Sequence, residues 1–88
     1  REANTAGRLQ LERGLAELGL EIAPSVANFV YVELGRDARP VFEALLREGV
    51  IVRPMHGFGA PEALRLSVGT DEENVICLEA LARVLPAL

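Results

Sequence analysis

The 88-residue sequence contains no lysine, and all nine of its basic side chains are arginine. It has no tryptophan, and its single cysteine, Cys77, excludes a disulfide bond within the chain. So little cysteine is typical of a protein from the reducing cytoplasm. The single histidine, His56, has no cysteine or acidic pair at ligand spacing, so we expect no metal site and an exposed loop histidine. The composition therefore argues against a disulfide-stabilised secreted domain and against a metalloprotein.

The charge pattern also excludes several classes of protein. The formal net charge is −4, and no stretch gathers basic residues, so nothing favours nucleic-acid binding. No apolar run approaches the length that crosses a bilayer, and the polar start is unlike a signal peptide. Hydrophobic residues make up 50% and charged residues 25%, as in soluble globular domains. Residues 1–88 form one domain at most, and because the first residue is not Met we expect a piece of a longer protein.

Apolar residues at helical spacing predict helices over residues 1–18, 38–48 and 71–86. Asp37 is placed to cap the second helix, and Thr70 with Glu73 forms a capping box for the third. The residues that we expect on the buried faces are Leu11, Leu15 and Leu18, then Val41, Phe42, Leu45 and Leu46, and finally some set of Val75, Leu78, Leu81, Ala82 and Leu85.

β-branched and aromatic residues predict strands at 28–33, 50–53 and 63–68. A shorter extended piece starts at Ile22 and is broken at Pro24-Ser25. The first strand is apolar on both faces, so we expect cover on both sides. In the third strand, apolar and polar side chains alternate, which predicts one buried face. The members of the buried face are Leu64, Leu66 and Val68, opposite Arg65 and Ser67.

The predicted order of elements is α-β-α-β-β-α. We therefore expect an α/β (α+β) domain in which helices cover a mixed sheet of about three strands. The unit formed by 28–33, 38–48 and 50–53 predicts that its two strands run parallel with a right-handed crossover. The chain then reverses through loop 54–62, so strand 63–68 should be antiparallel to its neighbours.

Arg53 and Arg65 stand at matched positions on the two strands that flank loop 54–62. Arginine is permanently charged and grips a carboxylate through two parallel hydrogen bonds, each charge-assisted bond contributing roughly 1.5–3 kcal/mol. The two side chains are therefore candidates for an anion site. The alternative for each is a strand charge that is solvated or paired with a surface carboxylate. The loop contains no phosphate-binding glycine motif, and we expect positive φ at Gly57 and Gly59 to serve only the connection.

Three segments in order carry a resemblance to a known family: PSVANFVYVEL (24–34), GVIVRP (49–54) and GFGAPEALRLSVGTDEEN (57–74). They resemble the C-terminal small domain of histidinol-phosphate aminotransferase, a fold-type I family that uses pyridoxal 5′-phosphate (PLP). The resemblance covers essentially the whole chain. Threonine-phosphate decarboxylase and other amino-acid aminotransferases have similar ends, so they remain alternatives. A stand-alone regulatory α/β domain that binds a ligand is the non-enzymatic alternative.

The resemblance implies roles for particular residues. Arg65 matches the arginine that binds the substrate α-carboxylate, and Arg53 matches one near the substrate phosphate. Asn28 and Pro24 match a structural signature, in which Asn28 ties the backbone near the site. The full enzyme would be a cytoplasmic homodimer of histidine biosynthesis that moves an amino group between histidinol phosphate and 2-oxoglutarate with PLP.

The same resemblance implies that the chain is incomplete as a catalyst. The family binds PLP on a lysine and holds the cofactor ring with an aspartate and an aromatic residue, and none of these has a counterpart here. They belong to the large domain of the family. We therefore expect no catalytic, cofactor-binding or metal-binding residue in residues 1–88, and no activity from this chain alone.

Overall fold

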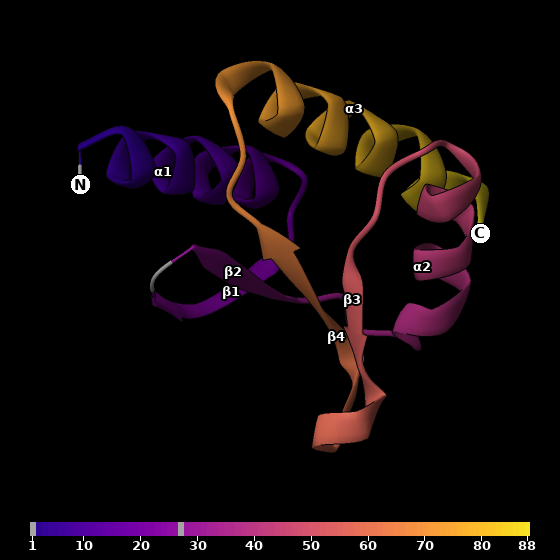
Figure 1. Ribbon diagram of the computed structural model, residues 1–88. Helices are drawn as coiled ribbons and strands as arrows, with labels where there is room; N and C mark the ends of the chain where they lie inside the picture. Colours follow the sequence, from indigo (N-terminus) through magenta and orange to yellow (C-terminus); the bar gives the residue numbers. More distant parts are fainter. Residues whose placement is uncertain (1, 27) are drawn as a thin grey trace.

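The computed structural model describes residues 2–26 and 28–88. The elements, in order, are α1 (Glu2–Glu17), β1 (Glu21–Val26), β2 (Phe29–Glu33), α2 (Ala38–Arg47), β3 (Arg53–Met55), a short 3₁₀ helix η1 (His56–Phe58), β4 (Ala60–Ser67) and α3 (Asp71–Ala87). In Figure 1, α1 packs on β1 and β2, α2 packs beside β3 and β4, and α3 lies against both other helices. The β3–β4 hairpin extends away from α1 and α3, with η1 at its tip.

The helices begin and end where the sequence indicates. Asp37 caps α2 by accepting a hydrogen bond from the Arg39 N–H, and Thr70 and Glu73 form the full capping box of α3. Gly19 and Gly49 follow α1 and α2 with φ angles of 81° and 82°, a left-handed conformation that glycine adopts without strain. These local signals mark both ends of α2, the end of α1 and the start of α3.

The sheet has four strands in the order β1-β2-β4-β3, and every neighbouring pair is antiparallel. The expected α/β class, with helices covering a small sheet, is confirmed, and so is the antiparallel placement of the strand that carries Arg65. The strands on either side of α2 do point the same way, because both are antiparallel to β4. They are not neighbours, however, since the tight β3–β4 hairpin inserts β4 between them, and no parallel pair forms in the described sheet.

Two strand boundaries differ from the prediction. Residues 21–26 form a complete strand, not a short piece ended by Pro24-Ser25, because β1 lies at the sheet edge and its register with β2 shifts between Ala23 and Val26. Proline is tolerated at edges and bulges, where its missing N–H breaks no ladder. The second predicted strand, 50–53, is displaced: β3 starts at Arg53.

The loop after β3 is also shorter than predicted. It contracts to η1 and Gly59, whose φ is 79°, whereas Gly57 does not have the positive φ that we expected. Residues 60–62 belong to β4 and not to the loop. The two strands that carry the arginines are thus joined by a compact turn, and their register shifts between Pro54 and Met55 before it reaches the Arg53–Arg65 pair.

The core lies between one sheet face and the three helices. It is built from aliphatic side chains that are fully or almost fully buried, including Leu11, Leu15, Val30, Val32, Val41, Leu45, Leu64, Leu66 and Leu81. Leu18 packs against this core, so the predicted face of α1 is confirmed. The predicted faces of the other two helices are only partly right.

On α2, Leu46 is 47% exposed and Phe42 is half-buried, while Ala38 and Ala44 are buried. The helix therefore approaches the sheet through small residues, and the buried stripe lies one position earlier than predicted. On α3, Val75 and Ala82 are exposed. The residues buried there are Asn74, Ala80, Leu81 and Val84, with Leu78 and Leu85 half-buried.

Candidate anion-binding site

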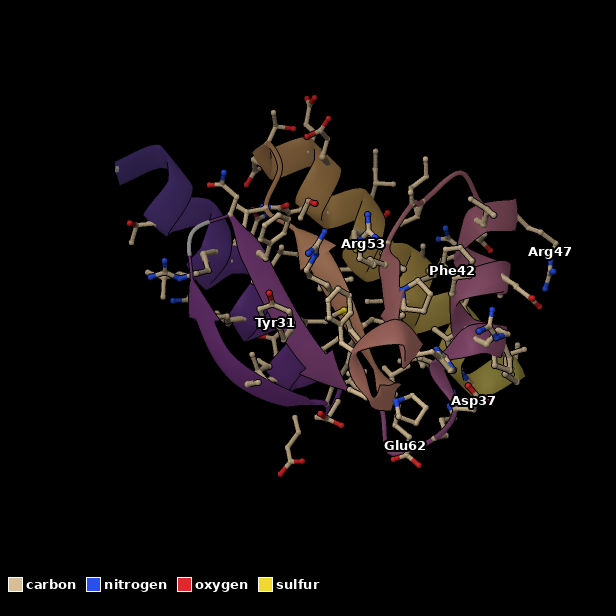
Figure 2. All side chains as sticks on the ribbon, turned by 60° about the horizontal axis from the view of Figure 1, so that its bottom comes forward. Tyr31, Asp37, Phe42, Arg47, Arg53 and Glu62 are labelled. Atoms are coloured by element: carbon tan, nitrogen blue, oxygen red, sulfur yellow. The ribbon has the colours of Figure 1, made fainter. Side chains whose placement is uncertain are left out.

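The sheet face opposite the core carries a row of polar side chains. Side chains alternate between faces along a strand, so Phe29 and Tyr31 lie opposite to Val30 and Val32, which enter the core. Tyr31 is the Cα partner of Arg65 in the β2–β4 ladder, and Arg65 is the Cα partner of Arg53 in the β3–β4 ladder. Since neighbouring strands are about 4.8 Å apart, the row spans about 10 Å. Figure 2 views this face and shows Tyr31 and Arg53 on it.

Arg65 is half-buried, and its guanidinium carbon lies 4.1 Å from the centre of the Phe29 ring. That distance is well within the range of a cation–π interaction. The position of Arg65 away from the core is as predicted. The aromatic contact was not predicted, because it joins two strands that are far apart in the sequence.

Arg53 is exposed and lies directly across from Arg65. Like charges at such a position repel each other. In the part of the chain that the structure describes, neither arginine has a carboxylate within ion-pair distance. The ion pairs found there join Arg8 with Glu12, His56 with Asp37, and Arg83 with Glu48. Two adjacent guanidinium groups without a counter-charge can bind an anion.

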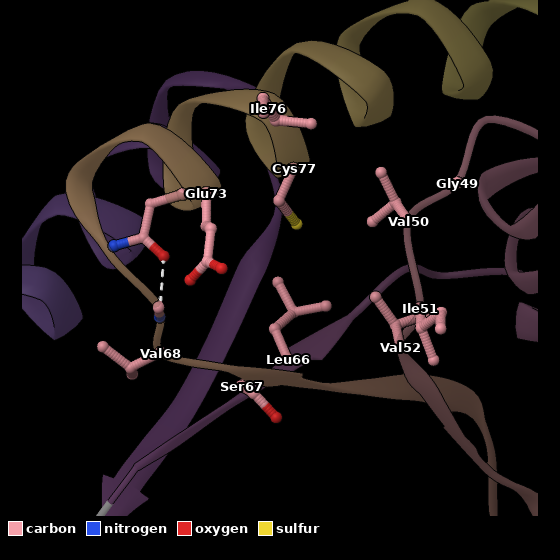
Figure 3. Close-up of a pocket in the computed structure, with 12 residues that line it drawn as sticks. Gly49, Val50, Ile51, Val52, Leu66, Ser67, Val68, Glu73, Ile76 and Cys77 are labelled. Atoms are coloured by element: carbon pink, nitrogen blue, oxygen red, sulfur yellow. Dashed lines mark hydrogen bonds between the residues drawn. The ribbon is translucent and has the colours of Figure 1, made fainter.

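A hollow of about 360 Å³ adjoins the two arginines, which help to line it together with Phe42, Ile51, Val52, Pro54 and Ser67. Its volume suits a small ligand. A second hollow of about 400 Å³ shares Ile51, Val52 and Ser67 with the first and continues to α3 (Figure 3). The lining of the first hollow combines apolar side chains with two cations, which suits a small organic anion better than a bare ion. The second hollow is lined in part by the Glu73 carboxylate, so the anion would belong in the first.

The tip of the arginine-bearing hairpin is tied to α2. His56 Nε2 lies 2.9 Å from Asp37 Oδ1, and the residue is half-buried, so it is not the exposed loop histidine that we expected. The pKa of Asp37 is lowered, first by the Arg39 N–H that it accepts at the helix cap and then by His56. One carboxylate thus joins the start of α2 to the turn between β3 and β4.

The resemblance predicts that Asn28 ties the backbone near the site. Its side chain is exposed, and its backbone carbonyl accepts a hydrogen bond of 2.7 Å from the Val68 N–H. This bond connects the β1–β2 turn to the end of the arginine-bearing strand β4. Pro24 belongs to β1, but its side chain lies outside the described ones, so its implied role stays a prediction.

Sequence reasoning missed the contribution of Phe29 and Tyr31. It treated them as one of two covered faces of a strand, whereas both are half-buried beside the arginines. One feature of the sequence could have indicated this placement. In their own strands, Tyr31 and Arg65 each alternate with side chains that enter the core, so both belong on the opposite face of the sheet. Only the register of β2 with β4 makes Tyr31 the Cα partner of Arg65 and brings Phe29 within reach of it.

The chemistry of the described side chains bears on which groups this candidate site could hold. PLP requires an amine to hold its aldehyde, and the sequence has no lysine, so these residues do not fit the cofactor by themselves. Burial raises the pKa of the Cys77 thiol to about 11, which keeps it protonated and unreactive near neutral pH. Within residues 2–26 and 28–88, no group of three or more His, Cys, Asp or Glu side chains could hold a metal ion. None of the described helices has the length and apolar character needed to span a membrane.

The fold is a small α/β domain whose open sheet face carries two adjacent arginines, a candidate site for a small anion. The chain belongs to the aminotransferase class I and II family, whose sequence model matches residues 1–81. It is 58% identical over 84 residues to histidinol-phosphate aminotransferase 2 of Methylococcus capsulatus, covering 96% of this chain and 23% of that relative. The resemblance found in the sequence is thereby confirmed.

Solved structures agree with this assignment. The aspartate aminotransferase of Thermus thermophilus with maleate is 37% identical and superposes with a TM-score of 0.85, covering 96% of this chain and 23% of that one. The histidinol-phosphate aminotransferase of Clostridium acetobutylicum has a TM-score of 0.86 at 22% identity, which shows the shared fold alone. The chain thus spans less than a third of the proteins that it matches.

Proposed function

We propose that this chain is the substrate-anchoring small domain of a PLP-dependent aminotransferase that acts on histidinol phosphate. In the full, cytoplasmic enzyme the amino group would pass between histidinol phosphate and 2-oxoglutarate. Family membership supports aminotransfer, and the name of the Methylococcus capsulatus relative supports the substrate. The 23% share of that relative supports a large domain outside these residues, which would supply the lysine and hold PLP. A homodimer is expected from the family.

The observation that carries the anchoring role is the unneutralised pair Arg53–Arg65 on the open face of the sheet. The Arg65 guanidinium lies over the Phe29 ring and offers a planar fork of N–H donors, which suits a planar carboxylate. Holding the carboxylate fixes how the substituents of the substrate Cα are oriented, and such positioning is a large source of rate enhancement. Maleate in the Thermus thermophilus relative is a dicarboxylate, which supports carboxylate recognition by this fold.

Arg53 would serve the phosphorylated substrate. Histidinol phosphate is an amino alcohol ester without a carboxylate, so its phosphate is its only anionic group. A phosphate dianion offers charge and oxygens for both guanidinium groups, whereas the α-carboxylate of 2-oxoglutarate, one of its two carboxylates, needs only Arg65. The pair would therefore accept both substrates of the exchange in turn.

A second substrate class is an unphosphorylated amino acid, which the relation to an aspartate aminotransferase favours. Two more candidates are a threonine-phosphate decarboxylase and a stand-alone ligand-binding regulatory domain. The coding sequence upstream of Arg1 separates the stand-alone domain from the enzymes. A large α/β domain with a Ser-x-x-Lys segment there supports the enzyme, and an isolated short gene supports the binding module.

The kinetic test uses the full-length protein that carries this chain, with PLP bound. Arg65→Lys should lower kcat/KM for amino-acid substrates by at least about tenfold, because an ammonium cannot replace a two-pronged contact. Arg53→Ala should reduce kcat/KM for histidinol phosphate more than for an unphosphorylated amino acid. Arg13→Lys, on the exposed side of α1, is the matched control. Unchanged kinetics in Arg65→Lys would refute the anchor, and equal losses in Arg53→Ala would remove Arg53 from the phosphate role.

A further inference from the structure

The contact between Phe29 and Arg65 joins the two strands at the centre of the sheet. Phe29 is the Cα partner of Ser67, and Tyr31 is the partner of Arg65, so Phe29 is a diagonal neighbour of the arginine. Diagonal neighbours are about 7–8 Å apart, which aromatic and long side chains can bridge. The separation of 4.1 Å between the guanidinium carbon and the ring centre shows that these two side chains do bridge it.

Arg65 needs a restraint that the rest of the site does not give. A free arginine side chain has many rotamers, and Arg53 directly opposite repels its charge. No carboxylate in the described part of the chain is close enough to hold it. Without another contact, the guanidinium would turn away from Arg53 and into solvent.

An aromatic ring can restrain the arginine and still leave its charge and its N–H donors available to an anion. A carboxylate partner would occupy the N–H groups and cancel the charge, so it would compete with an incoming anion. The face of Phe29 attracts the cation but accepts no strong hydrogen bond and carries no net charge. The donors in the plane of the guanidinium stay available to a ligand.

We infer that Phe29 is a positioning residue, which holds the Arg65 guanidinium in the orientation that binds the substrate anion. The inference rests on the proposed function in one respect, that Arg65 is the anion ligand. Phe29 itself has no group that binds an anion, so it acts through the arginine. Its role in this chain is distinct from filling the core, since it lies on the face opposite to Val30 and Val32.

The test measures anion binding directly, with maleate and inorganic phosphate as probes and the full-length protein in its cofactor-bound form. Phe29→Leu keeps an apolar side chain of similar size but removes the ring, and it should raise both dissociation constants about fivefold to tenfold. Phe29→Tyr keeps the ring and should restore binding to within about twofold of the parent. Calorimetry gives the constants, and the thermal midpoint of each variant reports its stability separately.

Two further measurements keep the outcomes distinct. Phe29→Met serves as a second ring-free variant in case the leucine variant does not fold. In the parent protein, NMR should show the Arg65 side-chain protons shifted upfield by the ring, and the shift should disappear in either ring-free variant. A ring-free variant that loses stability but keeps its affinity for both probes would overturn the positioning role.

Arg65→Gln is measured in parallel to separate this inference from the proposed function. If Arg65→Gln abolishes binding and Phe29→Leu leaves it unchanged, the positioning role is refuted and the anchor stands. If Arg65→Gln also leaves maleate binding unchanged, the anchor itself is refuted, and the inference with it. Loss in both variants, with rescue by tyrosine, supports both.

Discussion

Arg53 and Arg65 are direct Cα partners on the antiparallel strands β3 and β4. The Cβ atoms of such partners are about 4.5–5.5 Å apart on one face of the sheet, where like charges destabilise the pair. No described carboxylate offsets this repulsion. Local destabilisation of this kind is common at ligand sites, where the bound ligand supplies the missing interaction.

Removing one charge of the pair should therefore stabilise the protein in the absence of ligand. We expect Arg53→Gln to raise the free energy of unfolding by about 0.2–1 kcal/mol at low salt. The gain should shrink at high salt, because Arg53 is exposed and its repulsion is screened. Urea unfolding at two ionic strengths measures both effects.

The effect of phosphate on stability gives a second test of Arg53→Gln. Phosphate that binds the arginine pair of the folded protein, and not the unfolded chain, should stabilise the parent more than the variant. Arg13→Gln, at an exposed position on α1, controls for the general effect of removing a positive charge. A variant that is less stable than the parent at low salt would contradict the repulsion.

The placement of Arg53 and Arg65 next to each other could be predicted because it depends only on residues that are close together in the sequence. Alternation in strand 63–68 places Arg65 on the polar face, and a single connection separates it from Arg53. The contact with Phe29 could not be predicted in the same way, since it depends on the pairing of β2 with β4, which are distant in the sequence. A pattern along one strand does not contain the register between two distant strands.

The same distinction explains the errors in the fold. Pro24 predicts a strand break, a rule that holds inside a sheet and fails at an edge, and edge position is a property of the whole sheet. On α2, helical spacing predicted that both Leu45 and Leu46 are buried, because the two residues are adjacent on the helix. The packing of α2 buries Leu45 and leaves Leu46 exposed, because the helix approaches the sheet through the small residues Ala38 and Ala44.

The two leucines of α2 give a direct test of the observed packing. Leu45 is fully buried and Leu46 is 47% exposed, although they are neighbours in one helix. Leu45→Ala should cost about 2–5 kcal/mol, as core truncations do, whereas Leu46→Ala should cost less than about 1 kcal/mol. Chemical denaturation of the two variants measures the difference. Equal costs would mean that the buried face of α2 is wrong.

Asn74 is 2% exposed and connects three parts of the chain. Its Nδ2 donates to the Gly7 carbonyl at 3.2 Å and to Gln10 Oε1 at 2.8 Å, and its Oδ1 accepts from the Gly69 N–H at 3.0 Å. Asn74→Ala leaves these groups without that partner, and each buried group so left costs about 1–3 kcal/mol. We expect a net loss of at least about 2 kcal/mol, despite the better helix propensity of alanine.

Urea unfolding checks the Asn74→Ala prediction, with Glu43→Gln on the exposed side of α2 as a control. Because Gly69 directly precedes the capped start of α3, hydrogen exchange should also speed up at the Gly69 and Thr70 amides. A variant as stable as the parent would show that the Asn74 hydrogen bonds are readily replaced by water.

The thiol of Cys77 predicts how stability depends on alkaline pH. Burial raises its pKa from the ordinary 9.0 to about 11, so between these values the folded chain keeps a proton that the unfolded chain loses. Unfolding then releases a proton, and the free energy of unfolding should fall as pH rises from 9 to 11, by at most about 1.4 kcal/mol per pH unit. Below pH 9 this contribution is constant. Comparing urea unfolding of the parent and Cys77→Ala across this range isolates the thiol, because all other titrating groups are shared. Parallel pH profiles for the two proteins would contradict the raised pKa, as would rapid alkylation of Cys77 in the folded parent near neutral pH.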